Sequence, residues 1–142
     1  MQWLIDILHR EGCSLVVSNH GVVKTFNKKG VRDLEDLLNH EPQFLHGATI
    51  ADKVIGKAAA GMAAYGGVKE IYADVMSRKA LPILDNNNIK YSYHKLVDNI
   101  IIPQGDNRCP LENIVAPAHT ATQVVQLLNE HFAHMKATQN QQ

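Results

Sequence analysis

Hydrophobic and polar residues alternate along the chain with two different periods, and the period changes several times. Apolar residues three and four positions apart predict amphipathic helices, whereas short β-branched and aromatic runs predict strands. The pattern predicts, in chain order, a helix over 2–10, hairpin strands over 13–18 and 22–26 around Asn19-His20-Gly21, a helix over 31–39, a central helix between Thr49 and Gly66-Gly67, a strand over 70–76, a helix over 78–84 with Ser77 as N-cap, a strand over 91–96, a strand or bent continuation over 97–102, and helices over 111–115 and 120–135.

The stretch from Gly47 to Gly67 is the centre of this prediction. Thr49 and Asp52 fit a capping box, with Thr49 as N-cap and Asp52 at the third helical position. Alanines and two glycines, Gly56 and Gly61, follow. Because glycine in a helix costs about 1 kcal/mol relative to alanine, this spacing predicts that the helix closely approaches a sheet or another helix.

A hairpin followed by alternating strands and helices predicts an α/β fold. We expect a mixed sheet of about five strands with helices on both faces, in a three-layer α/β/α arrangement. No linker or internal repeat divides the chain, so residues 1–136 are predicted to form a single domain. The polar residues 137–142 are predicted to be a disordered tail.

Composition narrows the classes of function. The 142 residues carry equal numbers of acidic and basic side chains, which removes the main argument for binding to nucleic acid or a membrane surface. The apolar runs are too short to span a bilayer, and the charged N-terminus does not resemble a signal peptide. Two cysteines, Cys13 and Cys109, do not make a disulfide framework. We therefore expect a soluble, cytoplasmic protein.

The first candidate for chemistry is the charged pair Asp52 and Lys53 at the predicted start of the central helix. The structural interpretation is a capping acid beside a surface lysine. The functional interpretation is a pocket in which Asp52 acts as general acid or base, while Lys53 and free backbone N–H groups hold an anion. Lys57, one turn later, would extend the same positive stripe.

The second candidate is Cys109, followed by Pro110 and Glu112. Proline favours the first position of a helix, so Cys109 is the predicted N-cap and Glu112 the third residue. A helix N-terminus and the neighbouring Arg108 would both stabilise a thiolate. Alternatively, Cys109 is a partly buried residue beside a turn, and Asn107 or Asp106 caps the helix.

The sequence contains no motif that would predict a metal or cofactor site. The eight histidines form no HExxH motif, no Cys-x-x-Cys pair exists, and neither GxGxxG nor a P-loop is present. His46, just before the central stretch, is retained as a candidate pocket residue.

Two segments resemble a known family: GATIADKVIGKAAAGMAAYGGVKEIYADVMS (47–77) and NRCPLENIV (107–115). They are similar to a small bacterial and archaeal family of unknown function placed in the cytidine-deaminase-like superfamily. The resemblance covers roughly residues 8–116. It implies a mixed five-stranded sheet and a central helix that carries active-site residues at its N-terminus.

The zinc motifs of that superfamily are missing. Zinc deaminases place [His/Cys]-x-Glu on the central helix and Pro-Cys-x-x-Cys at the start of the next one. Here the first motif is replaced by Ile50-Ala51-Asp52, or by Ala51-Asp52-Lys53 in the other register, and the second by Met76-Ser77-Arg78-Lys79. Without metal, an acid does not generate hydroxide from water at neutral pH, so zinc-dependent deamination is not expected.

The resemblance leaves a deaminase-like pocket in which Asp52, Lys53, Ser77, Cys109 and Glu112 are expected to converge. One hypothesis is a metal-independent enzyme for a small nucleotide-like or anionic molecule, with Cys109 as nucleophile or ligand contact. The other is a non-catalytic ligand-binding or interaction domain that has lost deaminase chemistry. By analogy with deaminase-like domains we also expect self-association, with Trp3 and the first helix as the interface.

Overall fold

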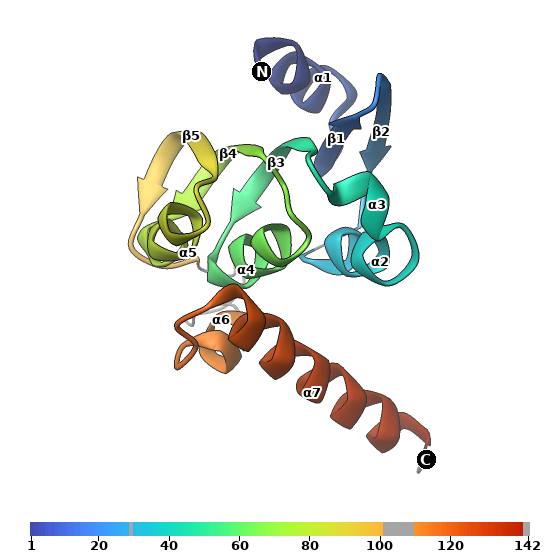
Figure 1. Cartoon of the computed structure of the whole chain (residues 1–142), viewed down its shortest axis with the longest axis vertical. Helices are drawn as coiled ribbons and strands as arrows, with labels where there is room; N and C mark the ends of the chain where they lie inside the picture. The colour runs from blue at the N-terminus through green and yellow to red at the C-terminus, as the bar shows by residue number, and fades with distance from the viewer. Residues whose placement is uncertain (29, 101–109, 141–142) are drawn as a thin grey trace.

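The computed structural model describes residues 1–28, 30–100 and 110–140 (Figure 1). Most predicted elements are present within a few residues of their expected bounds. In chain order the elements are α1 (Gln2–Glu11), β1 (Leu15–Asn19), β2 (Val22–Phe26), α2 (Arg32–His40), α3 (Pro42–Leu45), β3 (Thr49–Ile55), α4 (Lys57–Tyr65), β4 (Glu70–Ser77), the 3-10 helix η1 (Arg78–Ala80), α5 (Leu81–Asn86), β5 (Lys90–Val97), α6 (Pro110–Val115) and α7 (Ala121–Asn140).

The described residues form a five-stranded mixed sheet with the order β2-β1-β3-β4-β5. β1 is antiparallel to both β2 and β3, whereas β3, β4 and β5 run parallel. The hairpin between β1 and β2 turns at His20 and Gly21, which have φ angles of 53° and 76°. Positive φ at both central residues matches the twist of hairpin strands. The predicted mixed five-stranded α/β fold is confirmed, while the three-layer and cytidine-deaminase-like assignments stay predictions.

Residues 49–55 form a strand, so the predicted capping box and helix start are wrong. Thr49–Ile55 is β3, whose Ile50 pairs with Val17 of β1 on one side and Ile71 of β4 on the other. Four of its seven residues are β-branched, a composition that favours strands. Pairing with two neighbouring strands outweighs a local pattern of four residues. Asp52 and Lys53 therefore lie on a central strand.

α4 is a short helix of small residues, as predicted, but it begins only at Lys57. Gly61 allows close contact with α7, because a Cβ added there would lie 2.3 Å from Cγ1 of Val124. The predicted close approach at this glycine is confirmed. Gly67, with a φ of 81°, follows the end of the helix, as the Gly66-Gly67 stop predicts.

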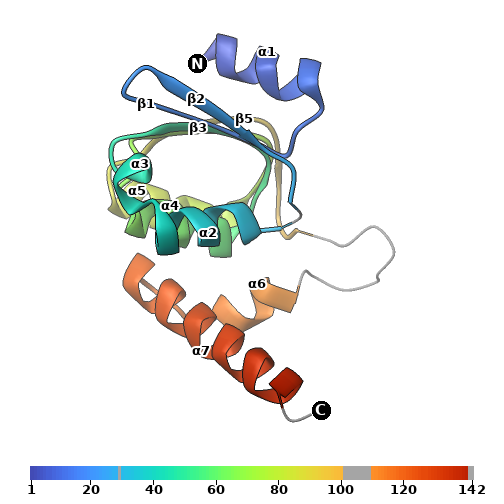
Figure 2. The same cartoon turned by 90° about the vertical axis from the view of Figure 1, so that its right-hand side faces the viewer.

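Helices lie on both faces of the sheet, but unequally (Figure 2). Among the described elements, α1 covers one face, while α2 to α5 cover the other; α6 and α7 lie beyond that helix layer, against α4. The main core fills the space between the sheet and the helices opposite α1. A smaller core beneath α1 consists of Leu4, Leu8, Cys13, Val16, Ala51 and Tyr72.

Three other segments differ in detail from the prediction. The helix predicted over 78–84 is η1 followed by α5, and Ser77 caps η1 by accepting the N–H of Lys79 at 3.1 Å. β5 ends at Val97; residues 98–100 are not strand, and 101–102 lie outside the described residues. α7 continues to Asn140, into the stretch predicted as a tail. No helix within the described ranges is long and apolar enough to cross a membrane.

Candidate functional site

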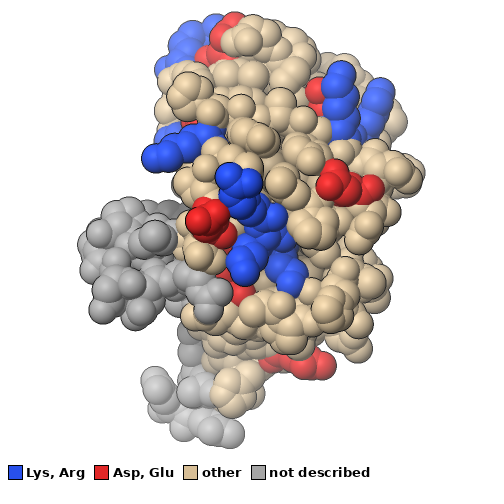
Figure 3. Space-filling model, turned by 90° about the vertical axis from the view of Figure 1, so that its left-hand side faces the viewer, with Lys and Arg blue, Asp and Glu red and all other residues tan. Residues whose placement is uncertain are grey.

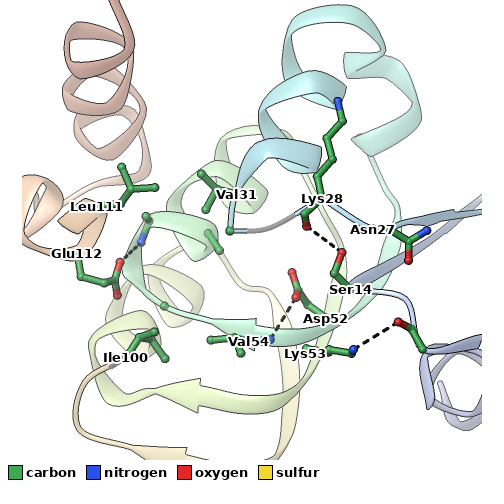
Figure 4. Close-up of a pocket in the computed structure, with 15 residues that line it drawn as sticks. Ser14, Asn27, Lys28, Val31, Asp52, Lys53, Val54, Ile100, Leu111 and Glu112 are labelled. Carbon is green, nitrogen blue, oxygen red and sulfur yellow. Dashed lines mark hydrogen bonds between the residues drawn. The ribbon is translucent and has the colours of Figure 1, made fainter. Parts of the chain in front are cut away.

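A cavity of about 380 Å³ lies where β3 ends and α4 begins (Figure 4). Its wall combines apolar side chains such as Val31, Ile100 and Leu111 with a few polar groups. Volumes of about 300–1,000 Å³ and a mainly apolar lining are typical of small-molecule pockets. The turn after α1, the segment after β2, the end of β3, the first turn of α4 and α6 all contribute to this wall.

Asp52 is the buried acid of this cavity, with 9% of its surface exposed. Its Oδ1 accepts the backbone N–H of Val54 at 3.2 Å (Figure 4). Burial raises the pKa of Asp52 to about 7, the negative charges of Asp33 and Asp74 act in the same direction, and backbone hydrogen bonds oppose them. Near pH 7 this carboxyl group is divided between its acid and its carboxylate form, so it can both donate and accept a proton.

Lys53 lies at the rim of the cavity and does not pair with Asp52. Its Nζ donates to the carbonyl oxygen of Gly12 at 3.4 Å, and Figure 4 shows the lysine side chain directed toward this residue, just after α1. Successive residues of a strand project to opposite faces of the sheet. Lys53 therefore lies on strand β3 and not in the first turn of a helix, where it was predicted to hold an anion together with free backbone N–H groups.

Glu112, one of the residues expected to converge on the pocket, caps α4 from α6. Its Oε1 accepts the N–H of Lys57 at 2.7 Å, and its Oε2 accepts the N–H of Ala58 at 2.9 Å. A carboxylate at this position satisfies backbone donors that a helix leaves unpaired and complements the positive end of the helix dipole. The N-terminus of α4 is therefore already occupied by an anionic group of the same chain.

Gly56 makes this cap sterically possible. A Cβ added to Gly56 would lie 2.2 Å from Oε1 of Glu112. The predicted close approach at Gly56 is thus confirmed, and its partner is a side chain of α6.

The remaining predicted site residues are dispersed. Lys57 lies at the first turn of α4, where its Nζ donates to the carbonyl oxygen of Ala116 at 2.9 Å, outside the main cavity. Ser77 is fully buried at the start of η1 and is engaged as a cap. His46 lines a separate hollow with Tyr65. Cys109 and Arg108 lie outside the described residues.

Two residues of this region were not singled out from the sequence. Ser14 lines the cavity, and its hydroxyl donates toward the carbonyl oxygens of Phe26 at 2.9 Å and Lys28 at 3.0 Å. Asp33 is 5% exposed and accepts the N–H of Lys28 at 3.0 Å. Both hold the segment after β2 against the cavity. The position of Asp33 could have been predicted, because it precedes the inward Leu37 by four residues and so shares its helix face. Nothing in the sequence around Ser14 indicated that it would line a cavity.

The described lining of this cavity contains no histidine or cysteine. The first turns of α2 and α4, which lie beside it, contain no histidine or cysteine. Across the described part of the chain, no group of three or more His, Cys, Asp or Glu side chains is placed to hold a metal ion.

Comparison with known proteins gives one family and one fold. The sequence model of the domain of unknown function DUF1893 matches residues 3–132. The crystal structure of the DUF1893 family protein TM1506 from Thermotoga maritima is similar, with a TM-score of 0.82 and 21% sequence identity over 92% of this chain and 88% of that one. At this identity the similarity concerns the fold alone. No curated protein matches the chain.

Proposed function

The chain belongs to the DUF1893 family, a family of unknown function, and from its cavity we propose that it binds a small nucleotide-like molecule beside Asp52. The observation that carries this proposal is a buried carboxyl group, with a pKa of about 7, that lines a pocket of ligand size. Perturbed acids in clefts are typical of functional sites. The resemblance to deaminase-like proteins supports the same class of ligand.

The mixed lining of the cavity supports a ring-shaped ligand with its own hydrogen-bonding edge. Val31, Val54 and Leu111 offer apolar contacts, and Asp52 offers one acid–base group. A heterocycle with an N–H group would donate to the carboxylate form of Asp52, and a ring nitrogen would accept from its acid form. The first kind of ligand is expected to bind more tightly above pH 7, the second below it.

Asp52 is also the residue that would support metal-independent acid–base catalysis. The non-catalytic alternative is favoured by the engagement of the other polar groups: Glu112 caps α4, Lys53 binds the Gly12 carbonyl, and the Ser14 hydroxyl faces two carbonyls. We therefore place ligand binding first and catalysis second.

Two-dimensional NMR of backbone amides tests this proposal with a panel of uncharged nucleobases and nucleosides at pH 6 and pH 8.5. Binding is expected to shift the amides of Val54, Gly56 and Ala58. Asp52→Asn should weaken binding by about tenfold or more, since hydrogen bonds to a charged group are worth roughly 1.5–3 kcal/mol. Glu130→Gln, on the exposed part of α7, is the matched control.

Failure has a clear form in this experiment. If no compound of the panel shifts these amides, or if Asp52→Asn binds as tightly as the unaltered protein, the proposal is wrong. Conversion of a bound compound, detected by mass spectrometry and lost in Asp52→Asn, would move the conclusion from binding to catalysis.

A further inference from the structure

A second, smaller cavity adjoins the one that contains Asp52. Its volume is about 40 Å³, and it shares Ile100 and Glu112 with the larger cavity. A polar space of this size holds a few water-sized groups. Two lysines from different elements, Lys57 of α4 and Lys79 of η1, line it together with Asn99. A ligand in the larger cavity would therefore have a positively charged neighbouring space.

Glu112 is the acid that the structure places beside these two lysines in the small cavity. Within the described ranges neither Lys57 nor Lys79 forms an ion pair, and the Nζ of Lys57 binds only the carbonyl oxygen of Ala116. Burial lowers the pKa of Lys57, and the negative charge of Glu112 opposes this effect. The positive charge of Lys79, the smallest of the three effects, lowers the pKa further. Two cations that line one cavity repel each other, and an anion bound between them would replace this repulsion with attraction to both.

The acids nearby are already engaged. Both carboxylate oxygens of Glu112 accept backbone N–H groups of α4. Asp98 pairs with Arg78, whose Nε lies 3.0 Å from its Oδ1. Figure 3 shows basic side chains gathered on the face of the molecule that carries α5 and β5. Among the described residues, these acids are thus engaged with backbone N–H groups or with Arg78, and neither pairs directly with Lys57 or Lys79.

We propose that Lys57 and Lys79 form an anion subsite, which holds a phosphate or carboxylate group of the ligand whose uncharged ring lies beside Asp52. The ring of this ligand rests on the proposed function, whereas the anion subsite is inferred from the two lysines. The N-terminus of α4 is not available to this anion, because Glu112 occupies it. The ligand class is then a heterocycle that carries an acidic group.

Amide NMR titrations with inorganic phosphate and, separately, acetate test the subsite at constant ionic strength. The chain is compared with Lys57→Gln, Lys79→Gln and the double variant. Saturable shifts are expected at Lys57, Ala58, Lys79 and Ala116. Each single substitution should weaken binding about tenfold, the range expected for one hydrogen bond to a charged group.

Lys90→Gln, which changes an exposed lysine at the start of β5, is the control and should bind like the unaltered protein. Tighter binding of phosphate identifies a phosphate-bearing ligand, and tighter binding of acetate a carboxylate. The proposal is overturned if neither anion gives saturable shifts, or if the double variant binds as well as the control. Because the probes contain no ring, their result is independent of the nucleobase test at Asp52: either half of the site can fail alone.

Discussion

Gly56 and Glu112 lie so close that any side chain on residue 56 would collide with the carboxylate, since an added Cβ would sit 2.2 Å from its Oε1. Gly56 has φ of −100° and ψ of −169°, angles open to most residues. Its glycine is thus explained by the carboxylate of Glu112 and not by backbone strain. This contact joins the strand–helix junction at the cavity to α6.

The first prediction is that substitutions at these two positions are not additive. Gly56→Ala should destabilise the fold by about 1–3 kcal/mol through overpacking. Glu112→Ala should cost about 1–3 kcal/mol because it leaves two part-buried N–H groups unpaired. In the double variant the clash is absent, so the loss should be clearly smaller than the two single losses together. Urea unfolding measures all three, and Glu130→Ala serves as the control. Additive losses would mean that the contact does not exist.

The second prediction concerns Gly61, where α4 meets α7. In an isolated helix, Gly61→Ala would stabilise the helical state by about 1 kcal/mol. Here the new Cβ would lie 2.3 Å from Cγ1 of Val124 and 2.5 Å from its Cβ, so α7 has to shift. We expect a net loss of about 1–2 kcal/mol in the free energy of unfolding. A variant more stable than the unaltered chain would contradict this packing.

The third prediction concerns the pH dependence that Asp52 imposes on stability. Its pKa is raised in the fold from 3.8 to about 7, so the folded chain binds this proton more tightly than the unfolded chain does. The resulting stabilisation is present below pH 4 and is lost as the pH rises to 7. Asp52→Asn should therefore match the unaltered protein at pH 4 and exceed it at pH 8.5 by up to about 4 kcal/mol. Chemical unfolding at several pH values checks this, with Glu130→Gln as control; a constant difference at all pH values would refute it.

The fourth prediction concerns Tyr72, which lies beneath α1 and donates its hydroxyl proton to Oδ1 of Asp74 at 2.6 Å. Burial, followed by this hydrogen bond, raises the pKa of Tyr72 to about 12. Asp74→Asn should lower this pKa but leave it above the ordinary value of 10, because burial is the larger cause. Tyrosinate absorbance, with Tyr72→Phe to identify the signal, measures the change. An unaltered titration in Asp74→Asn would show that the hydrogen bond has no effect.

Elements fixed by local chemistry were predictable from the sequence. The hairpin follows from Asn19-His20-Gly21, and β2 has the predicted bounds, because a two-residue turn sets the register of its strands. Gly61 correctly indicated a close contact, since glycine within a helix otherwise lowers stability. The sequence contained no information on which element would supply Val124.

The candidate site was less predictable, because its residues meet through long-range pairing. The four residues from Thr49 to Asp52 match a helix cap, but pairing with β1 and β4 makes them part of a strand. The contact of Glu112 with Lys57 spans 55 positions, and local patterns do not encode such a distance. Asp52 was nevertheless identified, because it forms a charged pair with Lys53 at the predicted start of the central helix, although that stretch is a strand.

The cap from α6 has a consequence for the order in which the chain matures during synthesis. All five strands of the described sheet precede α6 in the chain, so the sheet can form before α6 is available. At that stage Lys57 and Ala58 lack the carboxylate that accepts their N–H groups, and Leu111 is missing from the wall beside Asp52. A growing chain would thus acquire its sheet first and close its pocket only in its last third.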